Sequence, residues 1–299
     1  MINESKIVIT GGSGQIGKHL KRYLPDAVFL SSKDCNLMDM NQVDEMMNEN
    51  SPQIVIHLAA KVGGILEHLK NPLDYIEENL LINTNLLKMC HKHEVERVIA
   101  ILSTCIYPDK VEKYPACESQ LFNGPPAPGN FSYALSKRAM AAHIDAYVKQ
   151  FNKKWCYLIP CNLYGEFDKF DEDKSHFVSA LIKKIYNSEK TLNLYGTGKP
   201  LRQFMYADDL AKIIEIFIRR NINENVNVAP DYVHTIDEIA RIALNSCRKN
   251  DLKIKYNNNK NQDGQFRKDV DSSKLLSLIG DFKFTSLDKG IKKVYDNFS

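Results

Sequence analysis

An excess of charge of either sign is missing from this 299-residue sequence, in which 40 Lys+Arg and 37 Asp+Glu leave a formal net charge of +3. This balance argues against nucleic acid as the partner, because binding to phosphate backbones needs a strongly basic surface. Long apolar runs are also missing. None approaches the ~18 residues of a membrane-spanning helix, so no membrane association is expected. The seven cysteines lack the paired C-x-x-C spacing of metal sites, and no metal is predicted.

The cysteine count and the first residues together indicate a compartment. Seven cysteines cannot all pair within one chain. The first six residues are polar and do not resemble a secretory leader. We therefore expect a cytoplasmic protein with reduced thiols, most of which act as small core residues.

Short apolar runs alternate with helical patterns along the first half of the chain. Strands are expected at Ile7–Thr10, Ala27–Leu30, Ile54–Leu58, Val98–Leu102 and Trp155–Pro160. Helices are expected between them at Lys18–Leu24, Asn41–Asn48, Pro72–Lys92 and Tyr133–Gln150. Strands that are apolar throughout and separated by helices indicate a parallel sheet covered on both faces. The fold class is therefore α/β, with a Rossmann-type doubly wound parallel sheet.

The alternation weakens after about residue 165. Helices are expected there at Ser175–Asn187, Asp208–Arg219 and Thr235–Ser246. Thr235 with Glu238 three residues later is a capping-box pattern. We predict one domain over 1–165 and a smaller, interleaved C-terminal lobe over 166–299. Within that lobe, 200–220 is expected to pack back on the first domain.

A glycine-rich segment, G-G-S-G-Q-I-G, follows the first strand and opens the first helix. Gly11, Gly14 and Gly17 allow a tight turn, close approach of the backbone to a pyrophosphate, and contact between helix and sheet. The segment predicts a dinucleotide site. The cofactor residues expected in and around it are Gly11, Ser13, Gly14, Gln15, Ile16, Gly17, Leu58, Ala59 and Ala60.

The second strand ends in Ser31-Ser32-Lys33, where an NAD site would place a carboxylate against the ribose 2′-hydroxyl. Hydroxyls and a cation suit a 2′-phosphate instead. Ser32 and Lys33 therefore favour NADP(H) as the cofactor. Asp34 leaves two possibilities open, since its carboxylate can oppose that phosphate or point away and cap the turn.

Tyr133 and Lys137 are four residues apart and therefore share one helix face. A neighbouring ammonium is expected to lower the pKa of the phenol toward neutrality, and the lysine can also hold the nicotinamide ribose. Ser103 follows the strand Val98–Leu102, at the sheet edge where ligands collect in parallel sheets. These three residues are predicted to form a catalytic set beside the dinucleotide.

With the glycine-rich turn, this set resembles the extended short-chain dehydrogenase/reductase family. Within that family the chain resembles the GDP-L-fucose synthases, which are epimerase/reductases of GDP-4-keto-6-deoxymannose. The 4,6-dehydratases of the family carry Thr-Asp-Glu where this chain has Cys105. The matching stretches are T-G-G-S-G-Q-I-G, H-L-A-A-K-V-G-G, S-T-C-I-Y-P, I-P-C-N-L-Y-G, P-L-R-Q-F-M-Y and D-G-Q-F-R-K.

The resemblance implies a division of catalytic roles. Cys105 and His176 would act as base and proton donor at the two carbons that flank the sugar ketone. Tyr133 would protonate the ketone oxygen while NADPH delivers hydride, and Ser103 would hold that oxygen. Taken alone, a residue such as Cys105 is more often a buried strand-end thiol, and one such as His176 is more often a solvated loop residue; their joint match to the family motif favours the epimerase roles. His57, at a strand end, is expected to be a structural hydrogen-bonding residue.

The resemblance also implies where the rest of the substrate binds. Arg202 is expected to bind the diphosphate, because a guanidinium holds phosphate oxygens in a bidentate fork. The full set expected to bind substrate is Asn162, Lys184, Arg202, Arg267 and Lys268. Glu166, Lys169 and Ser179 depart from the family pattern, and all three lie in the segment that carries His176 and is expected to face the sugar.

The predicted activity is that of an NADPH-dependent 3,5-epimerase/4-reductase of a GDP-4-keto-6-deoxy sugar, forming GDP-L-fucose or a related GDP-sugar. One alternative is a C4-reductase only, acting on a GDP-4-keto sugar, such as a heptose, that another enzyme has epimerised. Another is a nucleotide-sensing module without turnover. In the family, the helices that correspond to Pro72–Lys92 and Tyr133–Gln150 pair across a two-fold axis, which implies a homodimer.

Overall fold

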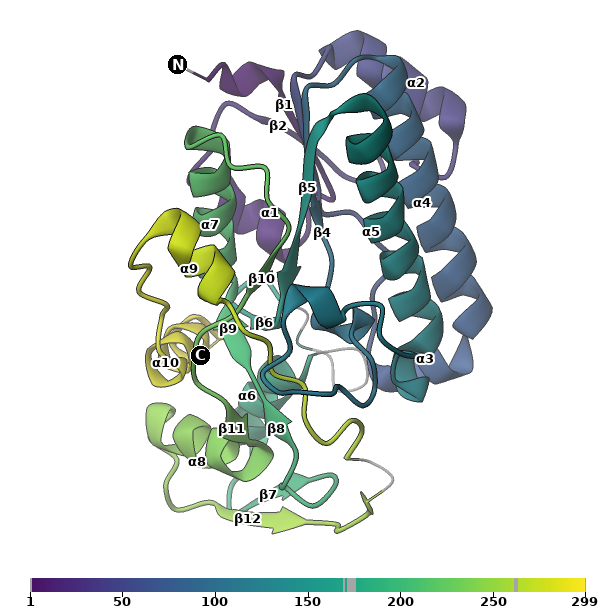
Figure 1. Ribbon diagram of the computed structural model, residues 1–299. Coiled ribbons are helices and arrows are strands. Elements are labelled where there is room, and N and C mark those ends of the chain that lie inside the picture. The colour runs from purple at the N-terminus through teal and green to yellow at the C-terminus, as the bar shows by residue number, and fades with distance from the viewer. Residues whose placement is uncertain (1, 169, 171–175, 261–262, 299) are drawn as a thin grey trace.

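A six-stranded parallel sheet forms the upper half of the computed structural model, which describes residues 2–168, 170, 176–260 and 263–298 (Figure 1). Its strands are β1 (Ile7–Thr10), β2 (Val28–Leu30), β3 (Ile54–His57), β4 (Arg97–Ile101), β5 (Lys154–Pro160) and β10 (Val226–Val228). They are ordered β10-β5-β4-β3-β1-β2, and each neighbouring pair is parallel. The predicted Rossmann-type α/β fold is confirmed.

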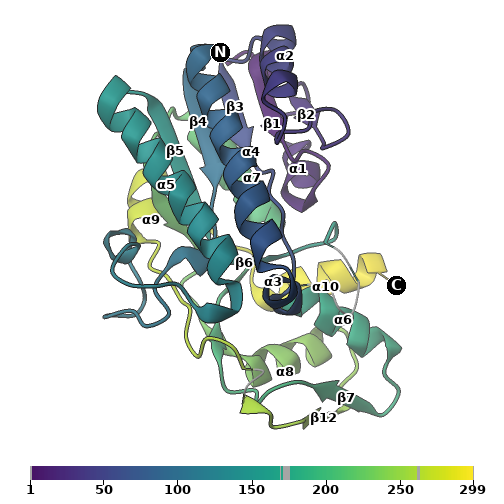
Figure 2. The same cartoon turned by 90° about the vertical axis from the view of Figure 1, so that its right-hand side faces the viewer.

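Helices cover both faces of this sheet, because most of its strands are apolar throughout and need a cover on each side. One face carries α2 (Met40–Asn50), α4 (Pro72–Lys92) and α5 (Phe131–Phe151). The other face carries α1 (Gln15–Leu20), α7 (Ala207–Arg219) and α9 (Ser273–Ile279). The short helix α3 (Ile65–Lys70) follows β3 and precedes α4. Figure 2 shows α4 and α5 side by side on the outer face.

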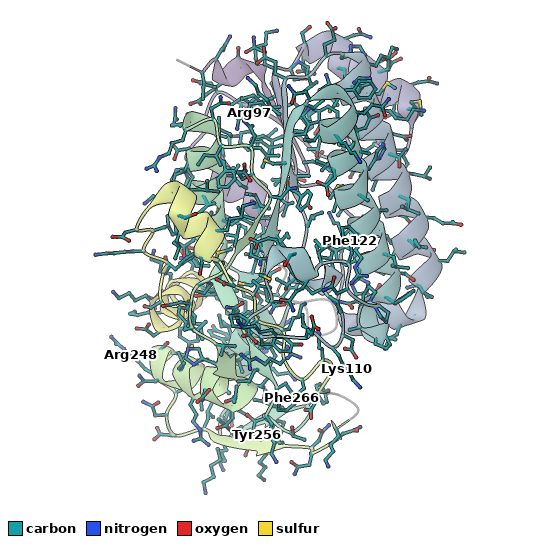
Figure 3. The ribbon with its side chains drawn as sticks, viewed as in Figure 1. Arg97, Lys110, Phe122, Arg248, Tyr256 and Phe266 are labelled. Carbon is teal, nitrogen blue, oxygen red and sulfur yellow. The ribbon has the colours of Figure 1, made fainter. Side chains whose placement is uncertain are left out.

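The second half of the chain contributes to this part of the fold both covering helices and a strand. α7 packs against α1, and β10 pairs with β5 in register Val226↔Leu158. Arg97, at the start of β4, fastens α7 to the sheet: its Nη2 donates to the carbonyls of Phe217 (3.0 Å) and Ile222 (3.0 Å) (Figure 3). Both carbonyls lie at or beyond the C-terminal end of α7, so the guanidinium joins this end of the helix to β4.

The lower lobe has a core of its own. It contains α6 (Phe177–Asn187), α8 (Ile236–Ser246) and α10 (Leu287–Phe298), as well as the parallel pair β7 (Thr191–Leu194) and β12 (Lys253–Tyr256). The remaining strands are β6 (Asn162–Tyr164) paired with β9 (Phe204–Tyr206), and β8 (Leu201–Arg202) paired with β11 (His234–Thr235). The predicted capping box is confirmed, since Glu238 N–H donates to Thr235 Oγ1 (3.1 Å).

The first helix begins earlier than the sequence pattern predicts. It was expected over Lys18–Leu24, whereas α1 spans Gln15–Leu20 and turns follow it. Gly14 is the N-cap, so the end of the glycine segment already forms the first helical turn. Among the described residues, no helix has both the length and the apolar character that crossing a membrane requires.

Candidate active site

One cleft of about 1970 Å³ lies where the carboxyl ends of the parallel strands meet the lower lobe. It brings together residues from both halves of the chain. Every residue predicted for the cofactor, the chemistry or the substrate lines this cleft, apart from Gly17 and Lys33. Binding at the carboxyl edge is what a doubly wound sheet predicts.

The glycine segment fits a pyrophosphate. Gly11 has φ +70°, and a Cβ there would lie 2.7 Å from the Ala59 nitrogen. A Cβ on Gly17 would lie 2.3 Å from the Gly12 carbonyl oxygen, so this glycine packs helix against loop and does not face the cleft. Gly14, the N-cap of α1, supplies no side-chain cap, which leaves the first N–H groups of the helix available to an anion.

The turn at the end of β2 lies where the ribose of the cofactor is expected. Asp34 accepts hydrogen bonds from the Ser31 N–H (2.7 Å) and Oγ (2.6 Å), and these bonds lower the pKa of its carboxyl. The carboxylate therefore caps the turn, one of the two possibilities left open above. Ser32 lines the cleft and Lys33 does not. The sequence pattern missed the lining stretch 36–38, which follows the turn and has no motif of its own.

The expected acidification of Tyr133 by Lys137 is wrong for this structure. Tyr133 is only 8% exposed, and its pKa lies well above the ordinary value because of burial first and the Cys105 charge second. Lys137 is buried as well, which lowers its pKa to about 7. Its Nζ donates to the Ile101 carbonyl (2.9 Å). The phenol therefore stays protonated at neutral pH, which is the form that a proton donor requires.

Cys105 lies in the turn that follows β4, two residues after Ser103. Ser103 Oγ accepts from the Cys105 N–H (3.3 Å) and caps this turn. Lys268 Nζ donates to Cys105 Sγ (2.9 Å). Burial raises the pKa of the thiol, but the charge and hydrogen bond of Lys268, with smaller effects of Ser103 and Arg202, leave the pKa below its ordinary value. Lys268 thus contacts the sulfur, a contact that the sequence did not predict.

His176 is the N-cap residue of α6 and is about half exposed at the mouth of the cleft. Its Nδ1 lies 3.3 Å from Asp168 Oδ1, while Ser179 Oγ donates to Oδ2 of the same carboxylate (2.5 Å). Glu166 and Ser179 do not line the cleft themselves, although Phe167 and His176 of the same segment do. Glu166 accepts a hydrogen bond from Tyr206 instead. The third departure, Lys169, lies outside the described residues.

The residues expected to bind substrate differ in how free their polar groups are. Arg202 donates to the Leu201 (2.8 Å) and Asp263 (3.1 Å) carbonyls. Arg267 forms a bidentate pair with Asp269 (2.6 and 2.9 Å). Asn162 Nδ2 donates to the Gln203 carbonyl (2.9 Å), and Lys184 Nζ lies 4.5 Å from the ring centroid of Tyr195.

Two histidines complete the site. His57 is fully buried between Thr10 Oγ1 (2.8 Å) and Asn83 Oδ1 (3.0 Å), and burial first lowers its pKa to about 3. Its predicted structural role is confirmed. His68 on α3 lines the cleft and packs its ring against Tyr133, with centroids 5.3 Å apart. The sequence did not indicate His68, since a single histidine in a short helix carries no motif.

Known proteins were compared with this chain. The family described as the NAD dependent epimerase/dehydratase family matches residues 7–229. The GDP-L-fucose synthase of Dictyostelium discoideum is 35% identical over 96% of this chain and 93% of its own length. A probable GDP-L-fucose synthase of Drosophila melanogaster is 33% identical over 96% and 94%. The structure of a GDP-L-fucose synthetase from Naegleria fowleri bound to NADP has a TM-score of 0.89 at 28% identity, covering 100% and 94%.

Proposed function

Because this chain belongs to the NAD dependent epimerase/dehydratase family, we propose that it is an NADPH-dependent 3,5-epimerase/4-reductase that forms GDP-L-fucose or a related GDP-sugar. The substrate is a GDP-4-keto-6-deoxy sugar. The observation that carries the proposal is the shared cleft, in which Tyr133, Cys105 and His176 line one space together with the glycine segment. The similarity to GDP-L-fucose synthases extends over 93% and 94% of the length of two such proteins, and this supports the substrate class.

The cofactor is NADP(H), which supplies a hydride to the ketone carbon when it is bound. Its pyrophosphate would lie against the segment from Gly11 to Gly14, and its 2′-phosphate near Ser32. Lys137 holds the ribose and Tyr133 donates its hydroxyl proton to the ketone oxygen. Ser103 donates a hydrogen bond to the same oxygen as charge develops on it.

The epimerase step uses the acidity of the carbons beside the ketone. A base removes the proton from one face, and the electron pair of the broken C–H bond becomes an enolate. A proton donor on the opposite face then restores the carbon with inverted configuration. We assign these two roles to Cys105 and His176, and we assign Arg202 and Lys184 to the diphosphate, which leaves Asn162 and Arg267 to shape the wall of the cleft.

Product analysis in deuterated solvent tests this function. The enzyme is incubated with NADPH and GDP-4-keto-6-deoxymannose, and NMR follows the label and the product. We expect deuterium at the two carbons that flank the ketone, together with stoichiometric oxidation of NADPH. Reduction without exchange would instead identify a C4-reductase of already epimerised sugars, and a preference for a heptose would show in the same assay. No oxidation of NADPH with any GDP-4-keto sugar would leave only a nucleotide-binding module.

Ser32→Asp tests the position of the 2′-phosphate. A carboxylate at this place in the cleft would repel a phosphate and accept a ribose hydroxyl. We expect the KM for NADPH to rise by about tenfold or more, which corresponds to roughly 1.4 kcal/mol, because the new carboxylate repels the 2′-phosphate. The KM for NADH should stay within about threefold, and Ser32→Ala is the control that removes the hydroxyl without adding a charge. An unchanged KM for NADPH in Ser32→Asp would place the phosphate elsewhere.

We also propose that the protein is a homodimer built on α4 and α5, in the cytoplasm. Large apolar side chains point outward from both helices: Leu73 and Leu81 from α4, and Phe131 and Phe151 from α5. The free state of its cysteines supports a reducing compartment. Light scattering should give twice the mass of one chain, and Leu81→Glu should weaken the association. A monomeric mass for the unmodified protein would refute the dimer.

A further inference from the structure

Lys268 reaches the catalytic turn from the opposite half of the chain. Its Nζ donates to Cys105 Sγ (2.9 Å), a contact between residues 163 positions apart. In the described part of the chain, this is the one hydrogen bond that the structure gives the Lys268 ammonium. A partly buried sulfur beside an ammonium favours the thiolate, because the positive charge attracts the anion and bulk water screens the pair only in part.

The backbone around Lys268 is fixed on both sides. The Leu201 N–H donates to the Phe266 carbonyl (2.8 Å), and residues 201 and 267 form a parallel bridge. On the other side, the Ala116 N–H donates to the Asp269 carbonyl (2.9 Å). Asp269 also holds the Arg267 guanidinium in a bidentate pair. A lysine held in this way points at the sulfur without further ordering of its own backbone.

We propose that Lys268 is the positioning residue that keeps Cys105 in its thiolate form, and that it is not a ligand of the substrate diphosphate. This inference rests on the proposed epimerase function, in which Cys105 exchanges a proton with the sugar. The thiolate accepts the proton from a C–H bond, and the electron pair of that bond becomes the enolate. The neutral thiol that results is the form that Lys268 favours least, which helps the proton leave again to solvent.

Other groups around the sulfur act less directly. Arg202 lies close enough to favour the thiolate, but its guanidinium is already engaged by backbone carbonyls. Ser103 adjoins the sulfur within the same turn, and Tyr133 faces it as a protonated phenol. Burial opposes the charged form. Lys268 is the charge in direct contact, so removing it should have the largest effect on the thiol.

The test measures the alkylation of Cys105 by iodoacetamide between pH 5.5 and 9.5, with peptide mass spectrometry as the readout. The full chain is used, saturated with NADP⁺ and without sugar. Cys117, the other partly exposed cysteine in the described part of the chain, serves as the internal reference. In the unmodified protein we expect the Cys105 rate to hold its plateau to lower pH than that of Cys117. If the alkylation rates of Cys105 and Cys117 depended on pH in the same way, the proposal would be wrong.

Substitutions of Lys268 separate the effect of its positive charge from other effects of the side chain. Lys268→Met keeps the length of the side chain and removes the ammonium, so the alkylation rate at pH 7 should fall about tenfold or more, because loss of the charge raises the pKa of the Cys105 thiol. Lys268→Arg should stay within about threefold of the unmodified protein. Lys274→Met, on the exposed face of α9, should change nothing. If Lys268→Met leaves the pH profile unchanged and only raises the KM for the GDP-sugar, Lys268 binds the diphosphate and the proposal is wrong.

A second readout separates this proposal from the proposed function. Solvent exchange at the sugar carbons should be slowed in Lys268→Met at pH 7 and should recover toward pH 9, where the thiol ionises without help. A loss of packing would not recover with pH. If the alkylation profile shifts but Cys105→Ser exchanges at the normal rate, the pair exists and the epimerase function fails. If exchange needs Cys105 but the profile does not shift, the function stands and the role of Lys268 fails.

Discussion

Replacing Tyr133 with phenylalanine should lower the rate of ketone reduction by about 10³-fold, the usual range for loss of a general acid. The phenol is buried and its pKa is raised, so it enters the reaction protonated and loses that proton only as negative charge develops on the ketone oxygen. The ring itself stays packed against His68, so affinity for NADPH should change by less than about threefold. Stopped-flow absorbance of NADPH measures both quantities.

The matched control for this substitution is Tyr114→Phe. Tyr114 also lines the cleft, and its hydroxyl donates to the Arg267 carbonyl (3.0 Å) rather than into the open space. We expect it to keep reductase activity within about threefold. In Tyr133→Phe, solvent exchange at the carbons beside the ketone should continue, because that step uses other side chains. A reductase rate for Tyr133→Phe close to that of the unmodified protein would rule out the phenol as proton donor.

Cys105→Ser should have the converse effect. A hydroxyl is far less acidic than a thiol and does not become an anion beside Lys268 at neutral pH. Solvent exchange at the sugar carbons should therefore fall by about 10²-fold or more. Reduction of a sugar that is already epimerised should stay within about threefold, since hydride transfer does not involve the sulfur. NMR for exchange and absorbance for reduction separate the two half-reactions in one preparation.

Cys117→Ser is the control for the cysteine substitution. Cys117 is partly exposed and does not line the cleft, so neither half-reaction should change. Equal loss of exchange and reduction in Cys105→Ser would indicate a structural defect at the turn after β4 and would contradict a separate epimerase role. Exchange at the normal rate would show that another base serves the sugar carbons.

The main sheet was predictable because its strands carry strong local signals. Residues 7–10, 54–57 and 154–160 are almost continuous apolar runs, and the long helix Pro72–Lys92 begins and ends where its pattern indicates. The strands of the lower lobe contain two to four residues each, too few for an alternating pattern to be recognised. The helix α10 did have a signal, since Leu287, Ile291 and Val294 repeat at helical spacing and are buried.

The candidate site divides in a similar way. The glycine segment and the spacing of Tyr133 and Lys137 are local, so their placement in the cleft followed from the sequence. The direction of the Tyr133 pKa shift did not follow, because it depends on burial by residues distant in the chain. Lys137 was expected to act on the phenol, but its ammonium donates to the Ile101 carbonyl, a partner 36 residues away.

By itself the sequence determined the class of fold, the dinucleotide turn and the identity of the reactive side chains, because these depend on periodicity and on residues within a few positions of one another. Only the tertiary structure decided which charge meets which reactive group. The motif that contains Lys268 predicts a contact with a phosphate. In the folded chain, however, the Lys268 ammonium contacts the sulfur of Cys105. Protonation states respond to burial and to charges across space, and neither quantity is encoded in the spacing of residues along the chain.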